Sequence, residues 1–153
     1  MEVFRIVKKD FAANLYASGR ANRWNVDDQF VIYTGGSRSL STLELIVHKN
    51  AIEPTFKYQV MIISIADEEE LFTSVLQADL SKSWRTMTAY PELQNIGSKW
   101  YQSNQSLVLK VPSAVITKEY NYIINTRHAD FAAKVSLVRS EDYFWDNRLL
   151  DPK

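Results

Sequence analysis

Four segments of the chain place polar, potentially reactive side chains among apolar residues. They are residues 20–25 (RANRWN), 31–34 (VIYT), 39–48 (SLSTLELIVH) and 111–128, which contains VPSAV and EYNYIIN. An arginine binds a phosphate through two parallel hydrogen bonds, so the first segment offers groups that could hold a pyrophosphate. Ser41 and Glu44 have the S-x-x-E spacing of a capping box, in which both side chains serve a helix N-terminus. The spacing alone does not decide whether Glu44 caps a helix or acts on a ligand.

Several enzyme classes are excluded by what the chain lacks. It contains no cysteine, which excludes thiolate nucleophiles, disulfide bonds and cysteine-bound zinc. His48 and His128 are its only histidines, and they lack the HExxH spacing of a zinc hydrolase, so no metal site is expected. No GxSxG, GxxxxGK[ST] or GxGxxG motif occurs. The pair Gly35-Gly36 could present backbone N–H groups to an anion, although a strand-to-helix turn is the commoner use of such a pair. A bound nucleotide would therefore be held by side chains.

The elements that position these segments are predicted from apolar spacing and β-branched runs. Strands are predicted at residues 2–7, 29–34, 57–65, 106–111, 121–125 and 134–139. Helices are predicted at residues 9–16, 40–49 and 91–102. Asp10 would cap the first helix, and Pro91 would occupy the first turn of the third. Because strands and helices mix without regular βαβ alternation, the sequence favours an α+β fold.

Length and charge narrow the partners and the location. The 153 residues fit a single domain, and the 18 basic residues are balanced by 18 acidic ones. This balance argues against direct binding to nucleic acid, which would need a basic excess. No apolar run approaches the roughly 20 residues of a membrane span. Residues 1–10 become charged within the first five and have no apolar core of a secretory signal. We therefore expect a cytoplasmic protein without membrane contact.

In this order and spacing, the four segments resemble the RES domain, a family named for its Arg, Glu and Ser. The family pattern reads roughly GGRWN, VVYTS, SLALLELLVH, VPSA and ENNYLINP followed by a histidine, with FxDxRL near its end. The resemblance runs from Phe4-Arg5 to Leu149, where residues 144–149 (FWDNRL) match the last piece. Each piece alone would be a weak signal, but together they are specific.

The resemblance implies a compact α+β domain over residues 1–153, related to ADP-ribosyltransferases. Members similar to this chain act on NAD⁺ by hydrolysis, phosphorolysis or ADP-ribosyl transfer, so NAD⁺ is a substrate and no separate cofactor is expected. A cognate antitoxin with a helix-turn-helix domain holds them inactive, and a homo-oligomer within the toxin–antitoxin complex is compatible with this. The expected function is that of a toxin that cleaves the nicotinamide–ribose bond of NAD⁺, depletes cellular NAD⁺ and arrests growth.

Matching the family motifs residue by residue gives the expected site. The expected catalytic residues are Arg23, Tyr33, Glu44 and Ser113. The expected NAD⁺-binding residues are Arg5, Arg20, Asn25, His48 and Asn121. The family's site then implies that Glu44 stabilises the positive charge that develops on the ribose, while nicotinamide leaves as a neutral ring without a general acid.

The resemblance gives the other three catalytic residues positioning roles. Arg23 would clamp the pyrophosphate. Tyr33 would stack on nicotinamide or hydrogen-bond the ribose, and Ser113 would hydrogen-bond the nicotinamide ribose or amide. Each also has a structural alternative: a cation–π pair between Arg23 and Trp24, a core position for Tyr33, and turn chemistry for Ser113. His48, one turn after Glu44, could simply orient that carboxylate.

The chain departs from the family pattern where Ala21-Asn22 replace the paired glycines in a shortened loop. Either Arg20 or Arg23 could therefore meet the phosphates. The short loop also leaves open a catalytically weak RES domain that binds nucleotide or antitoxin without turnover. A third alternative, an ADP-ribosyltransferase that modifies a host protein, would share the site and differ only in the acceptor.

Overall fold

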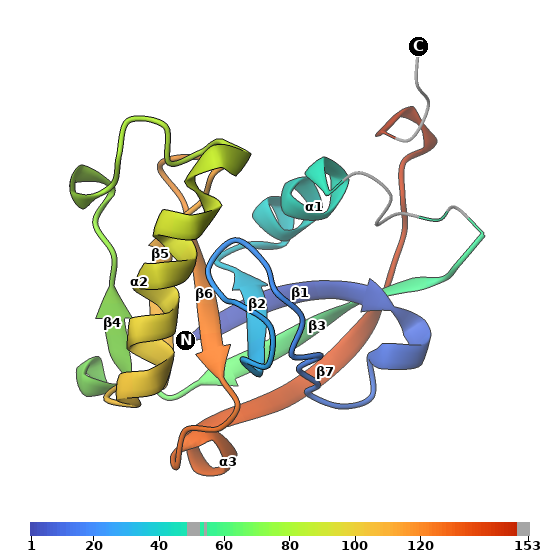
Figure 1. Ribbon diagram of the computed structural model, residues 1–153. Coiled ribbons are helices and arrows are strands. Elements are labelled where there is room, and N and C mark those ends of the chain that lie inside the picture. Colours follow the sequence, from blue (N-terminus) through green and yellow to red (C-terminus); the bar gives the residue numbers. More distant parts are fainter. Residues whose placement is uncertain (49–52, 54, 150–153) are drawn as a thin grey trace.

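A seven-stranded mixed sheet forms the centre of the computed structural model, which describes residues 1–48, 53 and 55–149. The strand order is β4-β5-β6-β2-β1-β3-β7, with β4 parallel to β5 and the other neighbours antiparallel (Figure 1). The strands are β1 (Glu2–Lys8), β2 (Val31–Gly35), β3 (Tyr58–Ile65), β4 (Phe72–Ser74), β5 (Val108–Pro112), β6 (Tyr120–Asn125) and β7 (Val135–Tyr143).

Three α-helices accompany the sheet in the described part of the chain. They are α1 (Arg38–Val47), α2 (Tyr90–Ser103) and the short α3 (Phe131–Lys134). None of the described helices is long and apolar enough to cross a membrane. Because helices and strands do not alternate regularly, the predicted α+β class is confirmed.

Successive residues of the central strands bury side chains on opposite faces of the sheet. Ile32 and Ile124 lie in one hydrophobic cluster with Val3 of β1. Their sequence neighbours Val31 and Ile123 lie in another cluster, built on α2 through Leu93 and Trp100. Burying a side chain of this size stabilises the fold by about 1.5–3 kcal/mol. The apolar runs noted in the sequence therefore form a sheet that is covered on both faces.

The two strands at the middle of the sheet, β1 and β2, meet at only one position. Phe4 pairs with Gly35, whereas β1 pairs with β3 along its whole length and β2 does the same with β6. Beyond Phe4 the strands separate, and side chains from both border a gap in the sheet. Helix α1 packs against β1 and β2 beside this gap, so it carries its own side chains to the same place.

Helix α1 begins at a cap that differs from the capping box suggested by the spacing. Ser37 is the N-cap, and its hydroxyl accepts a hydrogen bond from the Leu40 N–H. The Ser37 hydroxyl also donates to the Glu119 carboxylate at 3.1 Å. Ser41 lies inside the helix and donates to the backbone oxygen of Phe4 at 2.9 Å. Glu44 is therefore not a capping residue, and its carboxylate is available for another role.

The prediction of a helix at residues 9–16 is wrong. Only the 3-10 turn Lys9–Phe11 forms there, and Asp10 makes no capping hydrogen bond. The backbone oxygens of this segment bind distant side chains instead: Ala12 accepts from Ser140 at 2.7 Å, and Tyr16 accepts from Arg5 at 2.9 Å. These long-range bonds replace the local bonds that a helix would need.

The other predicted elements are confirmed with small shifts at their ends. The six predicted strands correspond to β1, β2, β3, β5, β6 and β7. The helix predicted at 91–102 is α2, while α1 begins at Arg38 rather than residue 40, and residue 49 lies outside the described residues. Strand β4 and helix α3 were not predicted, because segments of three and four residues are too short to show a period.

Candidate active site

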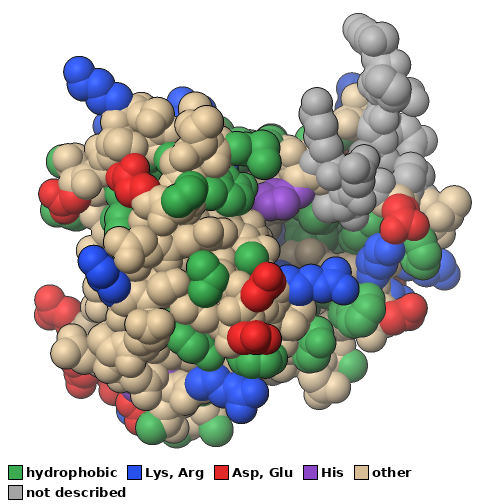
Figure 2. Space-filling model, viewed as in Figure 1, with side chains coloured by type: hydrophobic (Ala, Val, Ile, Leu, Met, Phe, Trp, Pro, Cys, Tyr) green, Lys and Arg blue, Asp and Glu red, His purple; other side chains and the backbone are tan. Residues whose placement is uncertain are grey.

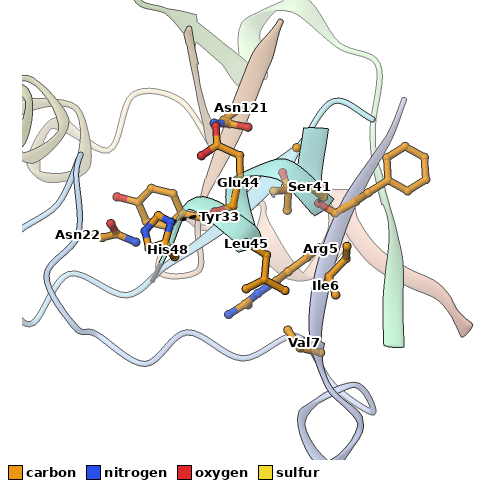
Figure 3. A pocket seen from close by; sticks show the side chains of 13 residues that line it. Arg5, Ile6, Val7, Asn22, Tyr33, Ser41, Glu44, Leu45, His48 and Asn121 are labelled. Carbon is orange, nitrogen blue, oxygen red and sulfur yellow. Dashed lines mark hydrogen bonds between the residues drawn. The ribbon is translucent and has the colours of Figure 1, made fainter. Parts of the chain in front are cut away.

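The gap between β1 and β2 opens into a hollow with a cavity volume of about 260 Å³. Residues of α1, both strands, β6 and the loop between β1 and β2 line it. Figure 2 shows this face hollowed beneath a histidine, with Lys or Arg side chains (blue) and an Asp or Glu side chain (red) along the lower edge. Figure 3 shows Glu44 reaching from α1 toward Asn121, Tyr33 and His48 to one side, and Arg5 beneath Leu45. The lining includes Arg5, Asn22, Tyr33, Glu44, His48 and Asn121.

The Glu44 carboxylate is held by one of its two oxygens. Its Oε1 accepts a hydrogen bond from the Ser113 hydroxyl at 2.7 Å and another from the Asn121 amide nitrogen at 2.6 Å. Among the described residues, no hydrogen bond to Oε2 is present, so this second oxygen remains able to contact a ligand. Helix α1 and two neighbouring strands thus fix the orientation of a single carboxylate in the hollow.

Ser113 holds Glu44 from behind rather than facing the hollow. The residue follows β5 and is fully buried, and its hydroxyl oxygen accepts hydrogen bonds from the N–H groups of Val115 and Ile116 at 3.0 Å each. These two donors leave the hydroxyl proton directed at Glu44. The Ser113 hydroxyl therefore both stabilises the turn after β5 and holds the Glu44 carboxylate.

Asn121 makes one strong contact and leaves one polar atom unsatisfied. Its amide nitrogen donates to Glu44, while its Oδ1 is buried without a hydrogen-bond partner among the described residues. Such a buried acceptor costs about 1–3 kcal/mol. Rotating the amide by half a turn would place Oδ1 against the carboxylate, so the contact with Glu44 fixes the observed orientation. A buried polar atom without a partner, such as Asn121 Oδ1, is a feature that functional sites often contain.

Tyr33 presents its ring to the hollow because its hydroxyl is occupied elsewhere. The hydroxyl donates to the Asn25 side-chain oxygen at 2.7 Å and accepts from the Trp24 N–H at 3.0 Å. Burial raises the pKa of Tyr33 well above its ordinary value, so the phenol stays protonated. Asn25 is itself buried and binds the backbone oxygens of Arg20 and Val26 at 2.9 Å. Asn25 therefore shapes the loop that supports Tyr33 and does not line the hollow.

Arg5 supplies the cation of the hollow. Its guanidinium donates to the Tyr16 backbone oxygen at 2.9 Å, and no carboxylate pairs with it among the described residues. Burial lowers the pKa of Arg5, because the charged form loses hydration. A guanidinium has five N–H donors, so most of its hydrogen-bonding capacity is open to an anionic ligand.

The structure does not bring Arg23 to the hollow. The Arg23 guanidinium donates to the backbone oxygens of Trp84 at 3.2 Å and Arg85 at 3.3 Å, and it lies over the Tyr90 ring at 4.8 Å. The cation–π partner is therefore Tyr90 rather than Trp24. Arg20 is exposed and lines a second, adjoining hollow together with Arg5.

Two further residues complete the first hollow. His48 lies at the C-terminal end of α1, and its Nδ1 is 3.0 Å from the backbone oxygen of Glu44, so it does not contact the Glu44 carboxylate. Asn22 also lines the hollow and is not among the residues expected from the sequence. Its position where the resembled pattern has a glycine was the one available signal.

The arrangement combines a fixed carboxylate, an aromatic ring and a partly buried cation within one hollow. A carboxylate stabilises positive charge, a ring face stacks on a planar group, and a guanidinium binds a phosphate. The ligand that this set suits is one with a positively charged planar ring and an anionic group.

Comparison with known proteins finds one family model and several similar proteins. The family model of the RES domain matches residues 2–146. A protein called "Toxin Res" from Yersinia enterocolitica is 30% identical over 97% of this chain and 99% of its own length. A "Toxin Res" from Photorhabdus laumondii is 27% identical over 100% of this chain and 99% of its own length. A "Prs ADP-ribosylating toxin" from a Sphingobium species is 27% identical over 95% of this chain and 91% of its own length. The chain therefore belongs to the RES domain family.

Proposed function

We propose that this chain is a toxin that cleaves the nicotinamide–ribose bond of NAD⁺ and thereby depletes cellular NAD⁺. The observation that carries the proposal is the Glu44 carboxylate, which lines the hollow, has one oxygen held by Ser113 and Asn121, and has no hydrogen bond to its other oxygen among the described residues. The toxin names of the similar proteins support the same reading.

The bond to be broken joins C1′ of the ribose to the pyridinium nitrogen. When it breaks, the electron pair stays on nitrogen, nicotinamide leaves neutral, and positive charge develops on the ribose. Glu44 stabilises this charge, and its fixed orientation means that little reorganisation is needed during the reaction. In hydrolysis, a water oxygen bonds to C1′, and ADP-ribose and one proton are released with nicotinamide.

The neighbouring residues bind the nicotinamide ring and the pyrophosphate, which lie on either side of the ribose. Tyr33 offers its ring face to the planar nicotinamide, and Arg5 binds the pyrophosphate. Ser113 and Asn121 act through Glu44 and are positioning residues. Asn25 acts one step further away, through the Tyr33 hydroxyl. His48 lies at the rim, where it contacts the entering ligand.

Among the described residues that line the first hollow, Glu44 is the only one with a carboxylate. Any acceptor hydroxyl must lose a proton as it attacks C1′. A water molecule is small enough to enter the hollow and give its proton to Glu44, whereas a protein side chain would have to reach into the hollow. This favours water or phosphate as the acceptor. The "Prs ADP-ribosylating toxin" of Sphingobium favours the second candidate, in which this chain transfers ADP-ribose to a protein.

Product analysis separates these candidates. Purified protein is incubated with NAD⁺ in phosphate buffer and in phosphate-free buffer, with and without a cell extract. Free ADP-ribose in both buffers indicates hydrolysis, and ADP-ribose 1″-phosphate in phosphate alone indicates phosphorolysis. Label that stays on extract proteins indicates transfer. Intact NAD⁺ under every condition would contradict the proposal and favour a domain that binds without turnover.

A protein that drains NAD⁺ harms the cell that makes it, so the proposal includes a neutralising antitoxin. We expect a partner with a helix-turn-helix domain, which binds DNA on behalf of the complex and covers the entrance to the Glu44 hollow. The chain's own net charge of zero supports this division of labour.

A further inference from the structure

A second hollow adjoins the first and is not used by the chemistry at Glu44. Its cavity volume is about 520 Å³, and it shares the residues Arg5, Ile6, Val7 and Leu45 with the first. Its other lining residues are Lys8, Phe11, Tyr16, Ser18, Arg20 and Tyr58. This lining contains three basic side chains and, among the described residues, no Asp or Glu.

Arg20 is the uncommitted cation of this second hollow. Among the described residues, the Arg20 guanidinium makes no hydrogen bond or ion pair, and the residue is exposed. Lys8, in contrast, is paired with Glu53 at 2.7 Å and lies over the Phe56 ring at 3.9 Å. The nearest carboxylate along the loop belongs to Asp27, which accepts a hydrogen bond from the Ala21 N–H and does not line the hollow.

The two hollows can hold the two halves of one dinucleotide, in which the pyrophosphate joins the nicotinamide ribose to the adenosine. Resting on the proposed function, the nicotinamide ribose faces Glu44 in the first hollow. Arg5 is the cation common to both hollows and takes the pyrophosphate that joins the two halves. The adenosine half then enters the second hollow, where the exposed rings of Phe11 and Tyr16 offer stacking surfaces.

Sites that distinguish the two pyridine dinucleotides do so at the ribose of this half. An acidic residue that hydrogen-bonds the 2′-hydroxyl selects NAD⁺ and repels a phosphate, whereas an arginine accommodates the 2′-phosphate of NADP⁺. The second hollow has an unpaired arginine and, within the described residues, no carboxylate in its lining.

We propose that the second hollow accepts a 2′-phosphorylated adenosine half, that Arg20 binds its 2′-phosphate, and that the enzyme therefore cleaves NADP⁺ as well as NAD⁺. The reaction is the same one: the C1′–N bond breaks, nicotinamide leaves with the electron pair, and water gives 2′-phospho-ADP-ribose and one proton.

Calorimetric titration tests this without turnover, because ADP-ribose and 2′-phospho-ADP-ribose both lack the nicotinamide bond. The wild-type protein binds the 2′-phosphorylated ligand about tenfold more tightly, as one charge-assisted hydrogen bond to a phosphate predicts. Arg20→Ser removes this preference. Lys99→Ser, which removes one exposed charge on α2 away from both hollows, keeps it.

Two outcomes would overturn the inference. One is equal or weaker binding of the 2′-phosphorylated ligand by the wild-type protein. The other is an Arg20→Ser variant that loses affinity for both ligands equally, since Arg20 would then hold the pyrophosphate.

A parallel assay of NAD⁺ and NADP⁺ cleavage separates this inference from the proposed function. Cleavage of NAD⁺ without a binding preference for the 2′-phosphate refutes the inference and leaves the function standing. A binding preference that Arg20→Ser abolishes, with neither dinucleotide cleaved, supports the binding of the 2′-phosphate by Arg20 but contradicts both the cleavage of NADP⁺ and the proposed function.

Discussion

Glu44 draws its two hydrogen-bond donors from different parts of the sheet. Ser113 follows β5 and Asn121 lies on β6, and both bind the same carboxylate oxygen. A carboxylate on a helix could otherwise rotate between several conformers. The two donors to one oxygen restrict this rotation, which is why we assign Ser113 and Asn121 to positioning.

Ser113→Ala tests the positioning role. The substitution removes one donor to Glu44, so kcat should fall about tenfold or more while KM changes little, because the lost hydroxyl is buried and does not reach the substrate. Steady-state kinetics gives this split, and the melting temperature reports the separate cost of the freed Val115 and Ile116 N–H groups. In a Glu44→Gln background, Ser113→Ala should reduce kcat no further. Independent losses in the double variant would show that Ser113 acts on the substrate itself.

Substitution by lysine distinguishes the phosphate-binding role assigned to Arg5 from the structural role assigned to Arg23. Arg5 lines both hollows, whereas the Arg23 guanidinium binds the Trp84 and Arg85 backbone oxygens. Since lysine cannot make two parallel hydrogen bonds to a phosphate, Arg5→Lys should weaken NAD⁺ binding about tenfold. Arg23→Lys should leave the affinity nearly unchanged and lower the melting temperature instead. Calorimetry on both variants decides the matter, and the reverse order of affinities would restore the phosphate role to Arg23.

The residues of the site were partly accessible from the sequence. Motif matching placed Glu44, Tyr33, Asn121, His48 and Arg5 in the site, and all five line the first hollow. The motifs could not show that Ser113 and Asn25 are buried behind the hollow and hold other site residues in place, because burial depends on the tertiary structure. Nor could they show that a loop would turn the Arg23 side chain toward the start of α2, where Tyr90 lies.

At the level of elements, helix α2 supports the loop that carries Trp24 and Asn25. The Trp24 backbone lies so close to Gly97 that a Cβ at position 97 would overlap the Trp24 carbonyl group. Gln94, one turn earlier on α2, donates to the Asn22 backbone oxygen at 2.9 Å. Gly97 weakens the helix by its own propensity, and the close approach of the loop explains why a glycine is present.

Gly97→Ala should therefore destabilise the protein although alanine is the better helix former. Overpacking of this kind costs about 1–3 kcal/mol, whereas alanine gains only about 1 kcal/mol over glycine in helix propensity. Chemical unfolding gives the change in free energy, and Asn95→Ala, at an exposed position of the same helix, is the matched control. An unchanged or raised stability in Gly97→Ala would mean that the loop moves away from α2 at little cost.

The secondary structure was predictable where the apolar pattern was long. The prediction failed where contacts from outside a segment determine its conformation. The patterns of β3 and α2 run over 8 and 14 residues, and both elements form close to the predicted bounds. The segment at 9–16 has helical spacing in Phe11 and Leu15, yet Arg5 and Ser140 bind its backbone oxygens. Ser140 is 128 residues from Ala12 and Arg5 lies outside the segment, so the apolar spacing of residues 9–16 could not reveal the competition.

For the whole molecule, the proposal predicts a specific pattern of toxicity. Expression of this chain alone should arrest growth and lower cellular NAD⁺, and co-expression with a neighbouring small helix-turn-helix protein should restore both. Cellular NAD⁺ is measured before growth stops, so that depletion is a cause rather than a consequence of arrest. Normal growth and unchanged NAD⁺ with folded protein present would favour a RES domain that binds without turnover.

The release of nicotinamide from NAD⁺ tests most directly whether the Glu44 carboxylate stabilises the ribose cation as the nicotinamide–ribose bond breaks. The wild-type protein should release nicotinamide, and Glu44→Gln, which keeps the shape and removes the charge, should be slower by a factor of about 100 or more. Glu70→Gln, an exposed control outside both hollows, should match the wild type. Nicotinamide release by a folded Glu44→Gln variant at the wild-type rate would contradict the account.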